Sequence, residues 1–205
     1  MLRQTLLAAG LTRGEVRTEI DRGAWHAIGW RTICVDGVRP SPEGQLWHAL
    51  WESGERSVLD GPTALLAWGL AGWTEPRLHI SVPDDMRIRR LEGVRHHILR
   101  DLGDHVPVGL RRTSSAVAAV RAAQWASTDR QAATLLAMTV QQKLVPPSDV
   151  MALWATIKRT PRRAFLDAVI ADVCDGAQSM NELDFARLCR RRGLPEPTRQ
   201  AVRTG

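Results

Sequence analysis

The segment that decides the fold of this chain is Arg3–Val35, which reads RQTLLAAGLTRGEVRTEIDRGAWHAIGWRTICV. Leucines at near-helical spacing predict a short first helix, and Gly10 marks its end because glycine commonly follows the last residue of a helix. Thr12 and Glu15 have the spacing of a capping box, in which each side chain binds the backbone of the other residue. We therefore expect a second helix over about residues 13–21.

Two short strand-like pieces follow the second helix. They cover residues 24–28 and 31–35 and are joined through Gly29 and Trp30. Helix, tight turn, helix and β-hairpin is the order of elements in a winged helix-turn-helix. We therefore assign residues 1–38 to a winged helix-turn-helix domain.

The second helix is expected to present a basic face to solvent. Val16 and Ile20 lie one turn apart and should face the core, which leaves Arg13 and Arg17 on the outside. In a helix-turn-helix protein such a face enters the major groove of DNA, where its N-terminal residues reach the base edges. The predicted DNA-binding residues are Thr12, Arg13, Arg17, Thr18, Arg22, His26 and Arg31. The alternative is that these residues only form the solvated face of a small subdomain.

The charge of the whole chain is basic. Lysine and arginine together number 28 against 22 acidic residues, which gives a formal net charge of +6, and only Lys143 and Lys158 are lysines. Arginine forms bidentate contacts with phosphate and guanine, so this composition favours a nucleic-acid partner. GC-rich coding also raises arginine content, so the charge alone does not establish such a partner.

Cysteine, histidine and hydropathy patterns exclude several other classes of protein. Cys34, Cys174 and Cys189 are widely spaced and form no CxxC pair, which predicts free thiols in a reducing compartment. His96 and His97 are adjacent, so in a strand they point to opposite faces and do not chelate one metal together. We expect neither a metal nor another cofactor.

No apolar run is long enough to span a bilayer, and charges interrupt the N-terminal apolar stretch. We therefore expect a cytoplasmic protein with no membrane partner.

Residues 39–112 predict a mixed α/β region. The segment PEGQLWHALWES has the apolar spacing of a helix, and Asp60 is placed to cap another. Alternation of polar and apolar residues predicts a strand over residues 77–83, with residues 93–100 as its partner across the basic loop DDMRIRR. A third strand is expected within residues 106–113. The prediction for this region is therefore a small antiparallel sheet with helices.

Residues 113–175 predict a helical region, because they are rich in alanine and leucine and contain several helix-length segments with one polar side. The whole chain is thus expected to belong to the α+β class and to be mainly α. Its predicted parts are a winged helix-turn-helix, a small antiparallel sheet in the middle, and a helical C-terminal half.

Residues 3–35 are similar to the winged-helix domain of AbiEi-type antitoxins, which belong to type IV abortive-infection toxin–antitoxin systems. The segment SVLDGPTALLAWGL, residues 57–70, looks like the continuation of that group, so the resemblance extends from Arg3 to Arg112. The resemblance implies DNA binding at the protein's own promoter. It also implies neutralisation of a toxin protein through the region that follows the winged helix.

Residues 176–200, GAQSMNELDFARLCRRRGLPEPTRQ, resemble the first helix of the very-short-patch-repair-like endonuclease fold. The resemblance places Glu182 at the position of a glutamate on that helix. The metal-binding carboxylates of that fold follow on strands, and this chain ends at Gly205, where those strands would begin. We therefore assign residues 176–205 to a truncated endonuclease-like domain. We expect no enzyme activity of the chain as given, with Glu182 a solvated acid in the first turn of its helix.

The preferred interpretation is an antitoxin-like transcriptional regulator that binds double-stranded DNA. Arg13 and Arg17 would read or clamp the major groove, while Arg22 and Arg31 would hold phosphates. A homodimer is expected, since a single winged helix reads few base pairs. Two alternatives remain: the N-terminal targeting part of a metal-dependent DNA endonuclease, and a protein-binding module that neutralises a toxin.

Overall fold

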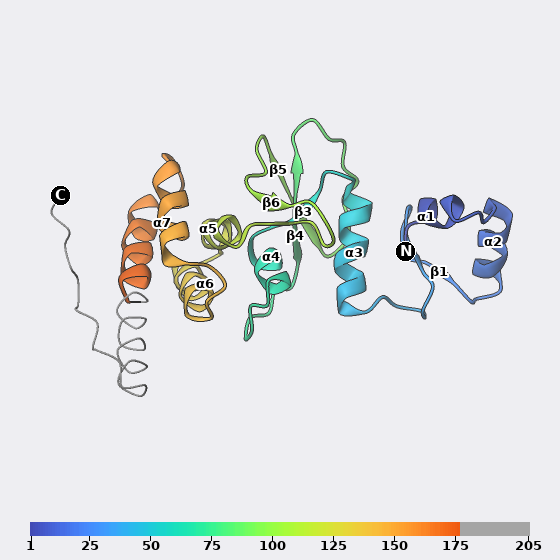
Figure 1. The fold of residues 1–205 in the computed structure, drawn as a ribbon, viewed down its shortest axis with the longest axis horizontal. Coiled ribbons are helices and arrows are strands. Elements are labelled where there is room, and N and C mark those ends of the chain that lie inside the picture. The colour runs from blue at the N-terminus through green and yellow to red at the C-terminus, as the bar shows by residue number, and fades with distance from the viewer. Residues whose placement is uncertain (177–205) are drawn as a thin grey trace, which may run out of the picture. The chain divides into compact units, whose positions relative to one another are not determined.

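The computed structural model describes residues 1–176, which fall into two compact units, Met1–Arg121 and the chain from Ala122 onward (Figure 1). The predicted boundaries at residues 38 and 112 both lie inside the first unit. The mixture of helices with small sheets confirms the α+β, mainly α class. Among the described residues, no helix has the length and apolar character needed to cross a membrane.

The first unit contains two small sheets and the helices around them. Its elements are α1 (Arg3–Ala8), α2 (Arg13–Asp21), β1 (His26–Ala27), β2 (Ile33–Cys34), α3 (Pro42–Ser53), β3 (Val58–Leu59), α4 (Gly61–Ala67), β4 (Leu78–Pro83), β5 (Val94–Leu99), β6 (His105–Val106), β7 (Arg112–Thr113) and α5 (Ser115–Trp125), whose last residues belong to the second unit.

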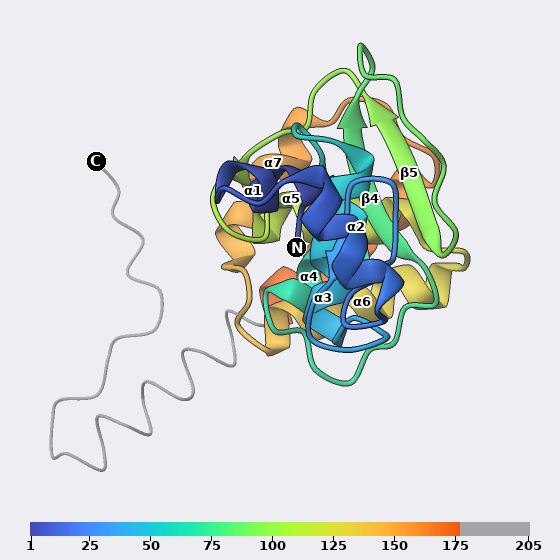
Figure 2. The same ribbon diagram turned by 90° about the vertical axis from the view of Figure 1, so that its right-hand side faces the viewer.

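The N-terminal elements follow the predicted order. Leu6, Val16 and Ile33 form a small buried core, and Ile20 packs against it, which confirms the predicted inner face of α2. β1 and β2 form an antiparallel hairpin. The first residues of the chain lie along the free edge of β2, where the Ile33 N–H donates to the Met1 carbonyl at 2.8 Å. Figures 1 and 2 show α1 and α2 on the side of α3 that faces away from the larger sheet.

The larger sheet corrects the prediction of a purely antiparallel one. Its five strands have the order β5-β4-β3-β7-β6, and the pairs β4–β5 and β3–β7 are parallel. Residues 84–93 carry the chain back along the sheet, so β5 starts beside the start of β4 instead of returning as a hairpin. The predicted third strand is two short strands, β6 and β7, which pair antiparallel with each other.

β4 is buried on both faces, although its alternating sequence suggested one exposed face. Ile80 and Val82 have no exposed surface and lie on the α3 side, where Ser53 of α3 contacts His96 on β5. Ser81 points to the opposite side, where its hydroxyl meets Asp60 at the start of α4. The polar positions of the alternation therefore face a buried polar cluster and not solvent.

Asp60 is the centre of that cluster. Its carboxylate accepts hydrogen bonds from Ser81 Oγ (2.5 Å), Gly61 N (2.7 Å), Thr113 Oγ1 (3.0 Å) and Arg121 Nη1 (2.6 Å). Burial raises the pKa of Asp60, and the Arg121 guanidinium and the other donors oppose that rise. The cluster ties β4, β7, α4 and α5 together by polar contacts, which is the condition under which burial of a carboxylate is tolerated.

The described part of the second unit is helical, as predicted. It contains α6 (Asp129–Gln141), α7 (Pro147–Thr156) and a further helical segment over residues 163–176. The buried apolar residues of α6 are Ala132, Leu135, Leu136 and Val140. Trp154 on α7 donates through Nε1 to Asp167 at 2.7 Å, and the Arg163 guanidinium stacks over the same ring. Cys34 in the first unit and Cys174 here are buried free thiols.

Candidate nucleic-acid interface

The start of α2 is fixed by the predicted capping box. Thr12 donates to Oε2 of Glu15 through both its N–H (2.7 Å) and its hydroxyl (2.8 Å), and the Glu15 N–H donates back to Thr12 Oγ1 at 3.2 Å. These hydrogen bonds hold the pKa of Glu15 below its usual value. The hydroxyl of Thr12 is thus engaged in the helix cap, which fits the capping role predicted for it.

Arg13 and Arg17 lie exposed on α2, as predicted. They line a groove of about 360 Å³ between α1 and α2, together with Arg3 and the apolar residues Leu7, Val16 and Ile20. The nearest carboxylate to Arg17 is Asp21, at 3.9 Å with both side chains largely exposed, so this pair contributes only about 0–1 kcal/mol. Arg3 was missed by the sequence analysis; its Nε is buried and has no hydrogen-bond partner among the described residues.

Three other predicted residues are less free to contact DNA. Thr18 donates its hydroxyl to the carbonyl of Gly14 at 3.0 Å. Arg22 forms an ion pair with Glu19 at 3.2 Å. His26 is half-buried on β1, and its Nδ1 has no partner within residues 1–176. The exposed basic side chains of α2 that remain most available are therefore Arg13 and Arg17.

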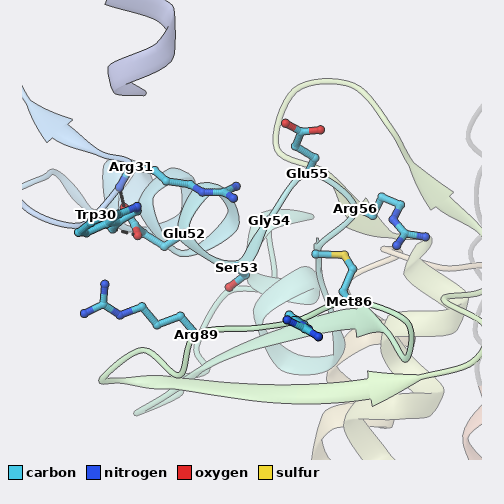
Figure 3. A pocket seen from close by; sticks show the side chains of 10 residues that line it. Trp30, Arg31, Glu52, Ser53, Gly54, Glu55, Arg56, Met86 and Arg89 are labelled. Carbon is cyan, nitrogen blue, oxygen red and sulfur yellow. Dashed lines mark hydrogen bonds between the residues drawn. The ribbon is translucent and has the colours of Figure 1, made fainter. Parts of the chain in front are cut away.

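The turn between β1 and β2 is anchored by Glu52, a buried carboxylate at the end of α3. Glu52 accepts hydrogen bonds from the N–H of Arg31 (2.7 Å), the hydroxyl of Thr32 (2.7 Å) and the N–H of Trp30 (3.2 Å), as Figure 3 shows in part. A Cβ atom at Gly29 would overlap this carboxylate, so the close approach requires glycine. The anchor fixes the backbone of the turn and leaves the side chains of Trp30 and Arg31 exposed, Trp30 by 75%.

A cleft of about 650 Å³ lies next to this turn (Figure 3). One wall is the turn itself, with Trp30 and Arg31, and the floor is the end of α3 with the residues that follow it. The other wall is the loop after β4, which was predicted as a basic loop. The lining residues are Trp30, Arg31, Glu52, Ser53, Gly54, Glu55, Arg56, Met86, Arg87 and Arg89.

The floor of the cleft depends on a glycine. Gly54 has a φ of +115°, a conformation that residues with a side chain rarely adopt, and a Cβ atom there would overlap the methyl group of Met86. Met86 belongs to the opposite wall. The lack of a side chain at Gly54 therefore allows this wall to lie close to the end of α3. Beside it, Arg56 is paired with Asp85 at 2.8 Å, and both side chains are exposed.

Net charge does not single out the N-terminal region. Residues 1–38 contain five arginines and four acidic residues, so the excess is small. Within the region, the side chains of Arg13 and Arg31 are exposed and form no ion pair with any residue of the described chain. The candidate interface therefore consists of individual exposed arginines on fixed backbone.

Comparison with known proteins assigns this chain to no family. No family model matches the chain. No curated protein is significantly similar to it either. Glu182 and Cys189 lie outside the described residues, and residues 1–176 contain no group of three or more histidine, cysteine or acidic side chains placed to hold a metal ion. The functional assignment therefore depends on the geometry of α2, the turn and the cleft.

Proposed function

We propose that this chain binds double-stranded DNA as a winged-helix regulator of transcription. In this proposal α2 enters the major groove, and the β1–β2 turn contacts the adjoining backbone as the wing. The observation that carries the proposal is the anchoring of the turn: two backbone N–H groups and the Thr32 hydroxyl donate to Glu52, while the side chains of Trp30 and Arg31 are left exposed. A buried anchor beneath two exposed, unpaired side chains is suited to holding them ready for a ligand.

The position of the arginines on α2 supports the same function. Arg13 is the first residue of the helix and Arg17 lies one turn later, so both are near its N-terminal end. Recognition helices reach base edges with their N-terminal residues, and arginine binds guanine through two hydrogen bonds. The capping box fixes the start of α2, so these side chains project from a defined backbone.

A narrower role belongs to the same proposal: regulation of a type IV toxin–antitoxin or abortive-infection operon. Its support is the resemblance of residues 3–112 to AbiEi-type antitoxins. A homodimer on a palindromic operator fits this role, because two copies gain affinity and a defined half-site spacing.

The test is DNA binding measured by fluorescence anisotropy with the protein's own upstream DNA and a scrambled duplex, over a salt series. We expect the wild type to prefer its own DNA, and Arg13→Ala/Arg17→Ala to lose most of that preference. The expected loss is about 30-fold or more, because each of the two base contacts contributes ~1–3 kcal/mol of discrimination.

The matched control is Arg130→Ala/Arg159→Ala, which removes the same charge from exposed positions in the second unit. This control should keep the sequence preference. Equal, weak and steeply salt-dependent binding of all three proteins to both duplexes would overturn the proposal, since it would reduce the arginines to a general charged surface. The toxin-neutralising alternative would then become the preferred function.

A further inference from the structure

We propose that the cleft between the β1–β2 turn and the loop after β4 is a second DNA-contact site. It would bind the phosphate backbone that flanks the segment read by α2. This inference rests on the proposed function and extends the contact surface beyond residues 1–38, which were predicted to carry DNA binding alone.

The arginines of the cleft differ in their pairing. Arg31, Arg87 and Arg89 form no ion pair with any residue in the described part of the chain, whereas Arg56 is already paired with Asp85. Figure 3 shows Arg31 on one side of the cleft and Arg89 on the other, with Trp30 between them at one end. Unpaired guanidinium groups that line one cleft from two segments far apart in the sequence favour an anionic ligand.

The carboxylates of the cleft do not cancel this preference. Glu52 is buried, and its two oxygens already accept three hydrogen bonds from the turn. Asp85, beside the cleft, is held by Arg56. Glu55 is the exception, because it is exposed and lines the cleft, and the charge it interacts with is that of Arg111, which does not line the cleft. It should weaken the binding of an anion. Neutralising Glu55 should therefore increase affinity, whereas removing an arginine of the cleft should decrease it.

The shape of the cleft indicates which part of DNA it takes. A volume of about 650 Å³ is too small to enclose a duplex, but it is open enough to admit a phosphate and its sugar. Arg31 belongs both to the turn and to the cleft, so a DNA backbone that contacts the wing leads directly to Arg87 and Arg89. Trp30, 75% exposed, offers an apolar ring face beside that path.

The test compares two duplexes that carry the same upstream site, one ending at the site and one extended by about one helical turn (~10 base pairs). The variant is Arg89→Ala. Its matched control is Arg90→Ala, which removes the same charge from an exposed neighbour on the same loop that does not line the cleft. Glu55→Gln is measured alongside, and all affinities are determined over a salt series.

We expect the wild type to bind the extended duplex more tightly than the short one. Arg89→Ala should weaken binding to the extended duplex about two- to fivefold and leave the short duplex unchanged, and its salt slope should fall by about 1. Arg90→Ala should match the wild type on both duplexes. Glu55→Gln should tighten binding to the extended duplex.

Identical behaviour of Arg89→Ala and Arg90→Ala would overturn the cleft as a contact site. If Arg13→Ala/Arg17→Ala still loses sequence preference in that case, the proposed function stands alone. If Arg89 matters and Arg13 with Arg17 does not, the cleft is retained and α2 as the reading helix is overturned. Arg89-dependent competition by a free mononucleotide, with no gain from the longer duplex, would assign the cleft to a small ligand and overturn the backbone assignment.

Discussion

The guanidinium of Arg121 donates a hydrogen bond of 2.6 Å to the carboxylate of Asp60, a side chain with no exposed surface. The same guanidinium also donates to the carbonyl oxygens of Leu102 and Asp101. One side chain from α5 therefore satisfies a buried charge and closes the loop that precedes β6. The pair should contribute strongly to the stability of the first unit, because removing one partner would leave the other charged and buried.

We expect Arg121→Ala to lower the free energy of unfolding by about 3–5 kcal/mol, as broken buried ion pairs do. The loss should depend on pH. Without Arg121, burial raises the pKa of Asp60 with less opposition, so the folded state holds a proton that the unfolded state has released. Stability of the variant should therefore fall as pH rises above the unfolded pKa of about 4. Urea denaturation from pH 4 to pH 7 measures this, and a pH-independent difference from the wild type would contradict it.

The His79–His97 pair predicts acid sensitivity of the wild type. The two rings meet at 3.1 Å between Nδ1 of His79 and Nε2 of His97. Burial lowers the pKa of His79 to about 4 and that of His97 to about 3, with Arg95 adding to both shifts. The unfolded chain takes up protons below about pH 6.5, so stability should be lost as pH falls from there towards 4.

Replacing His97 by glutamine should flatten this pH dependence, since one depressed group is removed. The measurement is the free energy of unfolding in urea at several values between pH 4 and pH 7. His105→Gln, at an exposed histidine, should leave the wild-type slope unchanged. If the free energy of unfolding of His97→Gln depends on pH as steeply as that of the wild type, other groups cause the acid sensitivity.

Glu52→Ala should destabilise the chain by roughly 1.5–3 kcal/mol, because it removes a charged acceptor from two N–H groups and a hydroxyl. Glu55→Ala, three residues later at an exposed position, should change stability by less than about 0.5 kcal/mol. Chemical denaturation compares the two. Amide hydrogen exchange at Trp30 and Arg31 should speed up only in Glu52→Ala, and equal exchange in both variants would contradict the anchoring of the turn.

Thr12→Ala should cost about 1 kcal/mol of stability through loss of the helix cap, and Thr12→Ser should restore most of it. If α2 reads DNA, the alanine variant should also bind its site more weakly, because the base-contacting end of the helix frays. Denaturation and anisotropy on the same samples test both effects. A stability loss with unchanged affinity would separate the cap from DNA recognition.

Trp30→Ala should leave the free energy of unfolding within about 0.5 kcal/mol of the wild type, because the side chain is 75% exposed. The same change should reduce affinity for the extended duplex if the ring lies beside the bound backbone. Denaturation and anisotropy together decide between a structural and a binding role for this residue. A large stability loss would mean that the exposed ring has a folding role.

Local features of the first unit were predicted well because their causes are local. The capping box of Thr12 and Glu15 fixed the start of α2, and apolar spacing fixed α3, which runs over Pro42–Ser53 as the segment PEGQLWHALWES predicted. Asp60 was also recognised as a helix cap. Each of these depends on residues within a few positions of one another, which is the range over which sequence patterns carry information.

The parts that were missed depend on partners distant in the sequence. Alternation in β4 indicated a strand, but strand direction in the sheet is set by the path of residues 84–93, which no periodicity encodes. Glu52 lies twenty residues or more from the groups it anchors, and Arg121 lies sixty-one from Asp60. The basic loop was visible in the sequence, but its position facing Arg31 depends on the fold of the whole first unit.

The distance between Asp60 and Arg121 has a consequence for the order of events during synthesis. When the ribosome has released residues up to Thr113, every strand of the larger sheet is available, but the cation for Asp60 is not. The Asp60 carboxylate can therefore be buried without a large free-energy cost only after α5 has been synthesised. Any fragment intended to stand for the first unit has to extend through Arg121, although the last strand ends earlier.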